Sequence, residues 1–133
     1  KDLEVINRNI EAAKEALEIL KVMEPLSKVH FNIDMYVITK AHGEYLTNNN
    51  KFSHRGENNS TVSDRFKNVN VEDLSENISN VGFRRTTFRP TIVQLLIDSG
   101  IENRGHRKNL LNPNNRFISI YIGKKICVQN FAK

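Results

Sequence analysis

The C-terminal stretch "FISIYIGKKICVQNF" constrains the fold of this chain more than any other part of its sequence. From Phe117 to Ile122, isoleucines alternate with other residues, which is the two-residue period of a strand with one buried face. The following "GKK" is typical of a tight turn, and "ICVQNF" returns as a second strand. The end of the chain therefore predicts a β-hairpin.

The N-terminal segment has the pattern of a long helix. Apolar residues recur there at alternating steps of three and four, which places them on one stripe: Leu3, Ile6, Ile10, Ala13, Leu17 and Leu20. Asp2 suits the N-terminal cap and Pro25 ends the helix, so we expect it over residues 1–24. The same spacing suits a coiled coil, but three heptads that stop at a proline favour a helix packed on its own domain.

A second helix is expected from about Val29 to Thr47. Its apolar positions share one face or border it: Ile33, Val37, Ala41 and Tyr45, with Ile38, His42 and Leu46 beside them. The asparagine run after Thr47 ends this helix, because asparagine tolerates the left-handed conformation. His42 lies on the apolar side, where a partly buried imidazole with a backbone or water partner is the expected role.

The middle of the chain is irregular. "TVSDRF" predicts a short helix capped by Thr61 or Ser63, and "SENIS" predicts a short strand or a turn. "RPTIVQLLIDSG" predicts a further helix, with Pro90 at its first position and Gly100 at its C-terminal cap. Helices first, then an irregular middle, a helix and a hairpin indicate an α+β fold rather than an alternating parallel one.

The composition describes a soluble globular protein. The 133 residues are 38% hydrophobic and 26% charged, which suits one domain with a buried core. The net charge of +5 permits attraction to anionic surfaces, and basic residues cluster in two places: Arg84, Arg85 and Arg89, and Arg104, Arg107 and Lys108. We interpret both clusters as solvated faces, with an anion-binding role as the alternative.

Cys127 is the only cysteine, so the chain cannot form an internal disulfide. It falls in a predicted strand and is expected to be a buried small hydrophobe. No apolar run approaches the roughly 20 residues of a membrane span. Because the sequence begins at Lys1 rather than at a methionine, we expect that its N-terminus has been trimmed, and a signal or lipid-anchor segment ahead of it would not be visible in this sequence.

No compact catalytic or metal motif is present: the sequence has no HExxH, no CxxC and no GxSxG nucleophile elbow. The residues able to bind a divalent cation or shuttle a proton are dispersed along the chain: His54, Glu76, Asp98 and His106. Taken separately, each is more simply an ordinary polar residue, and spacing alone cannot show that they meet. Phe52 is expected to anchor its loop in the core and so to fix the direction of His54.

Five segments, taken together and in order, resemble the CAP superfamily, which includes cysteine-rich secretory proteins and many bacterial secreted domains. They are "AHGEYLTNNNKFSHRG", "TVSDRF", "SENIS", "RGHRKNLLNP" and "CVQNFAK". The resemblance covers residues 25–133, and the helix over 1–24 is compatible with the N-terminal helix of the family. We therefore expect one CAP-like domain over residues 1–133. It is of the bacterial type, since the disulfides and the "GHYTQ" motif of eukaryotic members are absent.

The resemblance implies a three-layer α-β-α sandwich with a mostly antiparallel central sheet, and a cleft lined by two histidines and two acids. Carried over to this sequence, the histidines are His54 and His106 and the first acid is Glu76. The second acid falls best on Asp98, with Glu102 as a competitor. Two neutral imidazoles, joined by one or both carboxylates, suit zinc or another divalent cation, with water completing the shell. Such binding would weaken below about pH 6.

The leading functional hypothesis is a monomeric binding module, because the family has no single established reaction. Its cleft would take a divalent cation or a small polar ligand, and its partners would include a lipid or a host protein. The resemblance places such a module outside the cell or on the bacterial outer surface, with lipid anchorage through a removed N-terminal segment.

Two alternatives remain open at this point. A metal-assisted hydrolase or peptidase would use the cleft histidines, but no nucleophile is recognisable. Ser53 adjoins His54, yet neighbours on an extended chain point to opposite sides. A basic protein that binds anionic surfaces is the other alternative. The sequence lacks the aromatic interleaving of single-strand binders, so no nucleic-acid partner is expected.

Overall fold

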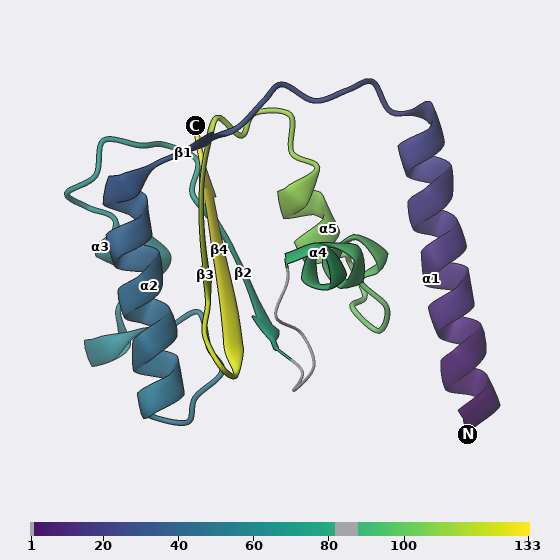
Figure 1. The fold of residues 1–133 in the computed structure, drawn as a ribbon, viewed down its shortest axis with the longest axis horizontal. Helices are drawn as coiled ribbons and strands as arrows, with labels where there is room; N and C mark the ends of the chain where they lie inside the picture. Colours follow the sequence, from purple (N-terminus) through teal and green to yellow (C-terminus); the bar gives the residue numbers. More distant parts are fainter. Residues whose placement is uncertain (1, 82–87) are drawn as a thin grey trace. The chain divides into compact units, whose positions relative to one another are not determined.

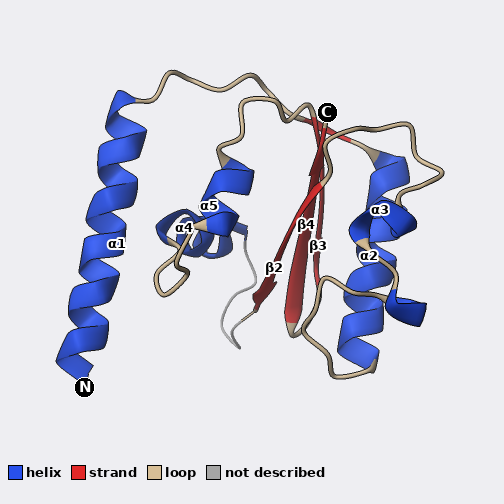
Figure 2. Ribbon diagram, turned by 180° about the vertical axis from the view of Figure 1, so that it is seen from behind, coloured by secondary structure: helices blue, strands red, loops and turns tan. Residues whose placement is uncertain are grey.

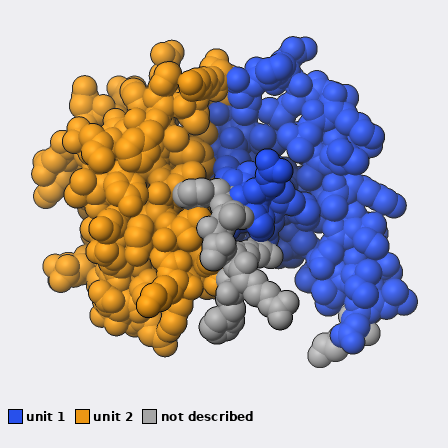
Figure 3. Space-filling view, viewed as in Figure 1, with its two compact units in different colours: residues 1–26, 86–112 blue, residues 27–85, 113–133 orange. Residues whose placement is uncertain are grey.

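The computed structural model describes residues 2–81 and 88–133. The chain forms two compact units, which Figure 3 shows in separate colours. Unit 1 comprises Lys1–Leu26 and Thr86–Asn112, and unit 2 comprises Ser27–Arg85 and Pro113–Lys133. The expectation of a single domain over residues 1–133 stays a prediction.

Unit 2 is built on a four-stranded sheet with the order β1-β3-β4-β2. The strands are β1 (His30–Phe31), β2 (Ser75–Asn80), β3 (Phe117–Ile122) and β4 (Ile126–Ala132). β4 pairs antiparallel with both β3 and β2, while the short β1 pairs parallel with β3 (Figure 1). The sheet is therefore mixed. The predicted hairpin and the strand interpretation of "SENIS" are confirmed.

The helix α2 (Ile33–Asn48) packs against β3 and β4. In Figure 2 it lies on the same side of the sheet as the short helix α3 (Val62–Arg65). Its buried face is formed by Met35, Thr39, His42, Gly43 and Leu46. The predicted face is partly wrong, because Ile33 and Val37 are 61% and 63% exposed.

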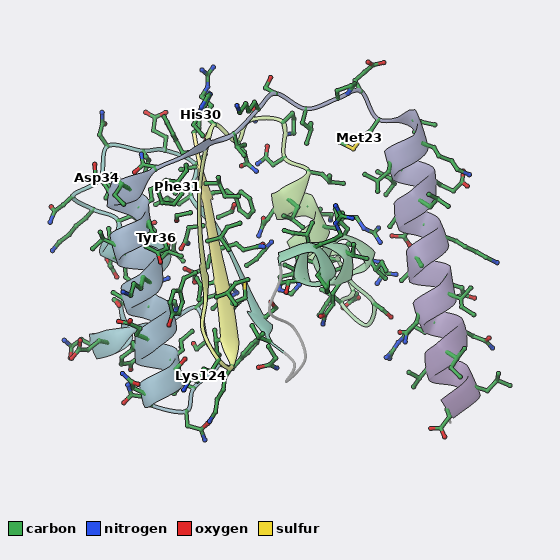
Figure 4. The ribbon with its side chains drawn as sticks, in the orientation of Figure 1. Met23, His30, Phe31, Asp34, Tyr36 and Lys124 are labelled. Atoms are coloured by element: carbon green, nitrogen blue, oxygen red, sulfur yellow. The ribbon has the colours of Figure 1, made fainter. Side chains whose placement is uncertain are left out.

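The predicted start of this helix at Val29 is also wrong. Asn32 is the N-terminal cap, and its side-chain oxygen accepts a hydrogen bond from the Met35 N–H at 2.9 Å. The two residues before the cap belong to β1, which leads directly into the helix. Figure 4 labels Phe31 on this strand and Tyr36 on the first turn of α2, whose rings lie 5.6 Å apart between centroids.

The core of unit 2 lies where α2 meets the sheet. β4 is buried along its whole length, because β2 and β3 flank it. One apolar cluster joins Leu46 and Ile78 to this strand, and another joins Met35 and Phe66 to it. Cys127 is fully buried, as predicted, and burial raises the pKa of its thiol to about 11.

Gly43 lets α2 approach the sheet closely. A Cβ atom at this position would lie 2.3 Å from Cδ1 of Tyr121 on β3, which is closer than two carbon atoms can pack. The Tyr121 ring therefore fills the space that a side chain at position 43 would need, so only glycine fits there.

The helix α3 follows a single 3₁₀ turn, η1 (Glu57–Asn59). Thr61 caps α3, since its hydroxyl accepts from the Asp64 N–H at 3.0 Å and the Asp64 carboxylate accepts from the Thr61 N–H at 2.8 Å. The structure thus selects Thr61 over Ser63 as the cap. It also places Arg65 at the end of this helix.

Unit 1 contains α1 (Asp2–Val22), α4 (Phe88–Ile97) and α5 (Gly105–Leu110). The helices predicted over residues 1–24 and in "RPTIVQLLIDSG" are present, whereas α5 was not predicted. The predicted ends of α4 are wrong, because it begins before Pro90 and ends at Ile97, three residues before Gly100. The predicted packing of α1 is also wrong. Its Leu and Ile stripe is exposed, with Leu3 at 68% and Leu17 at 53%, and only Ala12 and Ala16 are buried.

The physical reason is the side chain of Arg107 on α5, which is only 4% exposed. Its guanidinium donates to the carbonyl oxygens of Ala12 and Ile97 at 3.2 and 2.8 Å, and it pairs with Glu15. Small alanine side chains let the guanidinium reach the backbone of α1. Arg107 is therefore not part of a solvated basic face.

Candidate functional site

One predicted histidine and one predicted acid meet within unit 2. His54 lies in the loop after α2, and Glu76 lies on β2. The imidazole Nδ1 is 3.0 Å from Oε1 of the carboxylate. The His54 side chain is 58% exposed, whereas that of Glu76 is 1% exposed. The pair thus joins a buried anion to an imidazole that reaches solvent.

Buried partners hold the other carboxylate oxygen of Glu76. Nη2 of Arg65 donates to Oε2 at 2.5 Å, and Nδ2 of Asn130 donates to the same atom at 2.8 Å. Asn130 is the register partner of Glu76 on β4, so the sheet itself brings them together. Burial acts to raise the pKa of Glu76, but the hydrogen bond from His54, the charge of Arg65 and the Asn130 amide outweigh it, and the pKa is lowered.

A second imidazole, that of His42, also lies near the Glu76 carboxylate. Its Nε2 lies 3.0 Å from the Ser53 carbonyl and 3.7 Å from Oε1 of Glu76. Because a carbonyl only accepts, Nε2 carries the proton. The predicted buried histidine with a backbone partner is confirmed. Burial lowers the pKa of His42, and the neighbouring Glu76 carboxylate only partly opposes that shift.

The loop that carries His54 is not held as predicted. Phe52 is 57% exposed, so its expected role as a core anchor is wrong. The loop is instead fixed through its backbone, since Nη1 of Arg65 donates to the His54 carbonyl at 2.7 Å and His42 donates to the Ser53 carbonyl. The Ser53 hydroxyl accepts from the Arg55 N–H at 2.9 Å.

The other predicted histidine and acid meet within unit 1. Asp98 follows α4 directly, with φ of 51°, and its Oδ1 lies 2.8 Å from Nδ1 of His106. Its Oδ2 accepts from the backbone N–H groups of His106 and Arg107 at 3.0 and 3.4 Å. Asp98 is 4% exposed, whereas Glu102 is exposed. The acid paired with His106 is thus Asp98.

Both pairs fix the proton of the imidazole in the same way. A carboxylate oxygen can only accept, so Nδ1 of each neutral ring carries the proton and Nε2 carries the lone pair. This is the arrangement in which a carboxylate orients an imidazole that binds a metal through Nε2. Within the described parts of the chain, no three side chains from His, Cys, Asp and Glu lie close enough to hold a metal ion.

The sequence predicts that all four residues line one cleft. The structure brings His54 together with Glu76 in unit 2, and His106 together with Asp98 in unit 1. That the two pairs face one another stays a prediction.

Sequence reasoning missed the roles of Arg65 and Asn130. Arg65 stands in "TVSDRF", which we interpreted only as a capped helix, and Asn130 stands in "CVQNFAK". A signal was present, because Gln129 and Asn130 stand among apolar residues in a predicted strand, and a buried side-chain amide needs a polar partner.

Of the two predicted basic clusters, the first lies mostly outside the described residues, since Arg84 and Arg85 are not among them. In the second cluster Arg107 is buried, and Nε of Arg104 lies 3.1 Å from the Glu15 carboxylate.

Comparison with known proteins identifies the family. The profile of the CAP group, the cysteine-rich secretory protein family, matches residues 22–131. The chain belongs to the CAP family. The match spans parts of both units and contains all four predicted cleft residues.

Solved structures of two bacterial proteins share this fold. An extracellular protein of Bacillus anthracis with an SCP domain aligns with a TM-score of 0.68 and 24% identity over 81% of this chain and 34% of its own. An outer surface protein of Borrelia burgdorferi aligns with a TM-score of 0.66 and 16% identity over 99% of this chain and 92% of its own. These similarities show the α+β fold of CAP domains. The predicted α-β-α fold class is confirmed.

A curated relative is longer than this chain. The protein YlbC of Bacillus subtilis, named as an uncharacterized membrane protein, is 24% identical over 117 residues, which are 86% of this chain and 32% of YlbC. The chain thus spans about a third of that relative. Among the described residues, no helix has the length and apolar character needed to cross a membrane.

Proposed function

We propose that this CAP domain is a binding module that takes a divalent cation or a small polar ligand at its histidine–carboxylate pairs. The observation that carries the proposal is the shared geometry of the two pairs, in which a buried carboxylate holds Nδ1 of an imidazole at 3.0 Å in one and 2.8 Å in the other. Two separate parts of the chain thus prepare Nε2 as the ligand atom.

The chemistry of these groups favours nitrogen-binding cations. Neutral imidazoles suit zinc and similar transition ions, whereas magnesium and calcium prefer oxygen ligands. The carboxylate oxygens of Glu76 and Asp98 already accept hydrogen bonds from the protein. We therefore assign the ligand role to His54 and His106, and an orienting role to the two acids. A bound ion would polarise water or hold a polar ligand there.

The location of the protein is part of the same proposal. The similar structures from Bacillus anthracis and Borrelia burgdorferi carry the names of an extracellular and an outer surface protein. We propose that this domain likewise works outside the cell or on the bacterial outer surface, tethered by a lipid anchor. There a lipid or a host protein would be its larger partner, and the domain would act as a monomer.

Calorimetric titration with zinc tests the proposal, using the protein as it stands and its His54→Ala and His106→Ala variants. If both histidines hold one ion, the wild type binds one zinc and either variant abolishes binding. If the pairs act separately, it binds two ions and each variant loses one. Unchanged binding in both variants would show that neither imidazole is a ligand.

Calcium and magnesium provide the matched control in the same titration. Neither ion should bind measurably to the histidine pairs, because both prefer oxygen ligands. Calcium binding that His54→Ala removes would contradict the assignment of nitrogen ligands.

A further inference from the structure

A single side chain, that of Arg65, holds both partners of the exposed pair in unit 2. Nη1 donates to the backbone carbonyl of His54 at 2.7 Å, and Nη2 donates to Oε2 of Glu76 at 2.5 Å. The Arg65 side chain is 10% exposed. One planar group therefore fixes the loop that carries the imidazole relative to the carboxylate that orients it.

The second hold on Glu76 comes from the core of the same unit. Asn130 donates to Oε2 through Nδ2, and its Oδ1 accepts from the Thr39 hydroxyl at 2.8 Å. Because Thr39 and Asn130 are both fully buried, the amide cannot turn without breaking one of these bonds. Oε2 is thus committed to Arg65 and Asn130, which leaves Oε1 directed at the imidazole.

The loop itself contributes little apolar anchoring. Phe52, two residues before the imidazole, is 57% exposed, and the His54 side chain is 58% exposed. Hydrogen bonds to the carbonyls of Ser53 and His54 therefore take the place of hydrophobic packing in fixing this segment.

We propose that Arg65 is a positioning residue for His54: by bridging the His54 backbone and Glu76, it fixes the imidazole in the form that presents Nε2 to a ligand. This inference rests on the proposed function in that Nε2 is the ligand atom. Lysine could not replace arginine here, because a single ammonium group cannot supply two parallel donors in a fixed plane.

The test uses Arg65→Lys, which keeps the charge but removes the fork, and Arg55→Lys as a matched control. Arg55 lies in the same loop and its side chain donates to the Asn59 carbonyl, at 3.3 Å. Two-bond proton–nitrogen correlation spectra of protein with labelled histidines, recorded at about pH 8, identify which ring nitrogen carries the proton. This readout needs no metal, so it decides the inference even if zinc does not bind.

In the wild type, the His54 signal should show the proton on Nδ1. In Arg65→Lys the ring should exchange between its two neutral forms, while Arg55→Lys should resemble the wild type. Zinc affinity should fall about tenfold or more in Arg65→Lys alone, which is the usual effect of removing an outer partner of a metal-binding histidine. The signals of His106 should not change.

Two results would overturn the inference. One is a wild-type His54 with its proton on Nε2, which can be observed even if Arg65→Lys does not fold. The other is a folded Arg65→Lys protein with the wild-type ring form and zinc affinity. The wild type could also bind no zinc while His54 carries its proton on Nδ1 in a way that depends on Arg65. That result would reject the proposed function but uphold the positioning role of Arg65.

Discussion

The two histidine–carboxylate pairs reach the same local geometry by different routes. Asp98 and His106 are 8 positions apart, and the same carboxylate that holds the ring also accepts from the His106 backbone N–H. Glu76 and His54 are 22 positions apart, and join a strand to a loop. The Asp98–His106 pair depends on the short connection between α4 and α5. The Glu76–His54 pair depends on the packed interior of unit 2.

This difference predicts which pair is costly to disturb. Glu76 is surrounded by buried groups that depend on its charge, so its loss affects Arg65 and the sheet as well as the imidazole. Asp98 serves a short connection between two helices. Mutation of Glu76 should therefore destabilise the fold of unit 2, whereas mutation of Asp98 should act mainly on the segment that holds the His106 imidazole.

The largest effect is expected for Glu76→Leu. It leaves the guanidinium of Arg65 buried without its anion, which should lower the free energy of unfolding by about 3–5 kcal/mol. Urea denaturation measures this change. Glu44→Leu is the matched control, because Glu44 makes an exposed ion pair with Lys40 at 3.8 Å, and it should change stability by about 0.5 kcal/mol or less. Equal losses in the two variants would contradict the claim that Glu76 belongs to a buried ion pair whose loss is costly.

A smaller effect is expected at Asp98. Alanine there loses the accepted hydrogen bonds and is strained at φ of 51°, so Asp98→Ala should cost about 2 kcal/mol. Asparagine tolerates this conformation and keeps an acceptor, so Asp98→Asn should cost about 1 kcal/mol or less. Hydrogen exchange should locate both losses in α4 and α5. Faster exchange in β2 and β4 would contradict the local character of this pair.

Acidification should weaken unit 2 in two steps. The pKa of His42 is lowered from 6.5, so the unfolded state binds more protons and stability falls as the pH drops below 6.5. The pKa of Glu76 is lowered from 4.5, so a second loss begins as the pH drops below 4.5. Urea midpoints measured across this range report both steps. His42→Gln, which can still donate to the Ser53 carbonyl, should remove the part of the upper step that His42 contributes, and an unchanged upper step would be evidence against this origin.

The smallest effect is expected for Glu15→Gln in unit 1. Hydrogen bonds from Arg104 and Arg107 lower the pKa of Glu15, but its carboxylate is open to solvent and screened by salt. The melting temperature should fall slightly at low salt and match the wild type at about 1 M salt. A salt-independent loss would mean that Glu15 acts with Arg107 as a buried pair.

The sequence predicted strands and helices well where a regular apolar repeat or a capping residue stood within the element itself. The isoleucine alternation predicted β3, and the Thr61 cap predicted the start of α3. It failed on which helix face is buried, because Ala12 and Ala16, and not the leucines, contact the rest of unit 1. A hydrophobic period shows that an apolar face exists, but the contacts of a buried arginine with the helix backbone can bury a neighbouring face instead.

The candidate site divides in the same way. The family resemblance supplied His54, Glu76, Asp98 and His106, but it did not supply Arg65 and Asn130, which hold Glu76 in place. The distance from Arg65 to Glu76 depends on how α3 lies against the sheet, and no spacing in the sequence encodes that.

The burial of Cys127 protects its thiol from oxidation and alkylation in the folded protein. Burial raises the pKa of its thiol to about 11, so the thiol stays protonated at neutral pH, and Cys127 is fully buried within β4. In the folded state Cys127 therefore offers no reactive thiolate to an oxidant or an alkylating reagent. A reagent can alkylate Cys127 only after β4 separates from its neighbouring strands. The labelling rate of this thiol therefore reports how often the central strand opens.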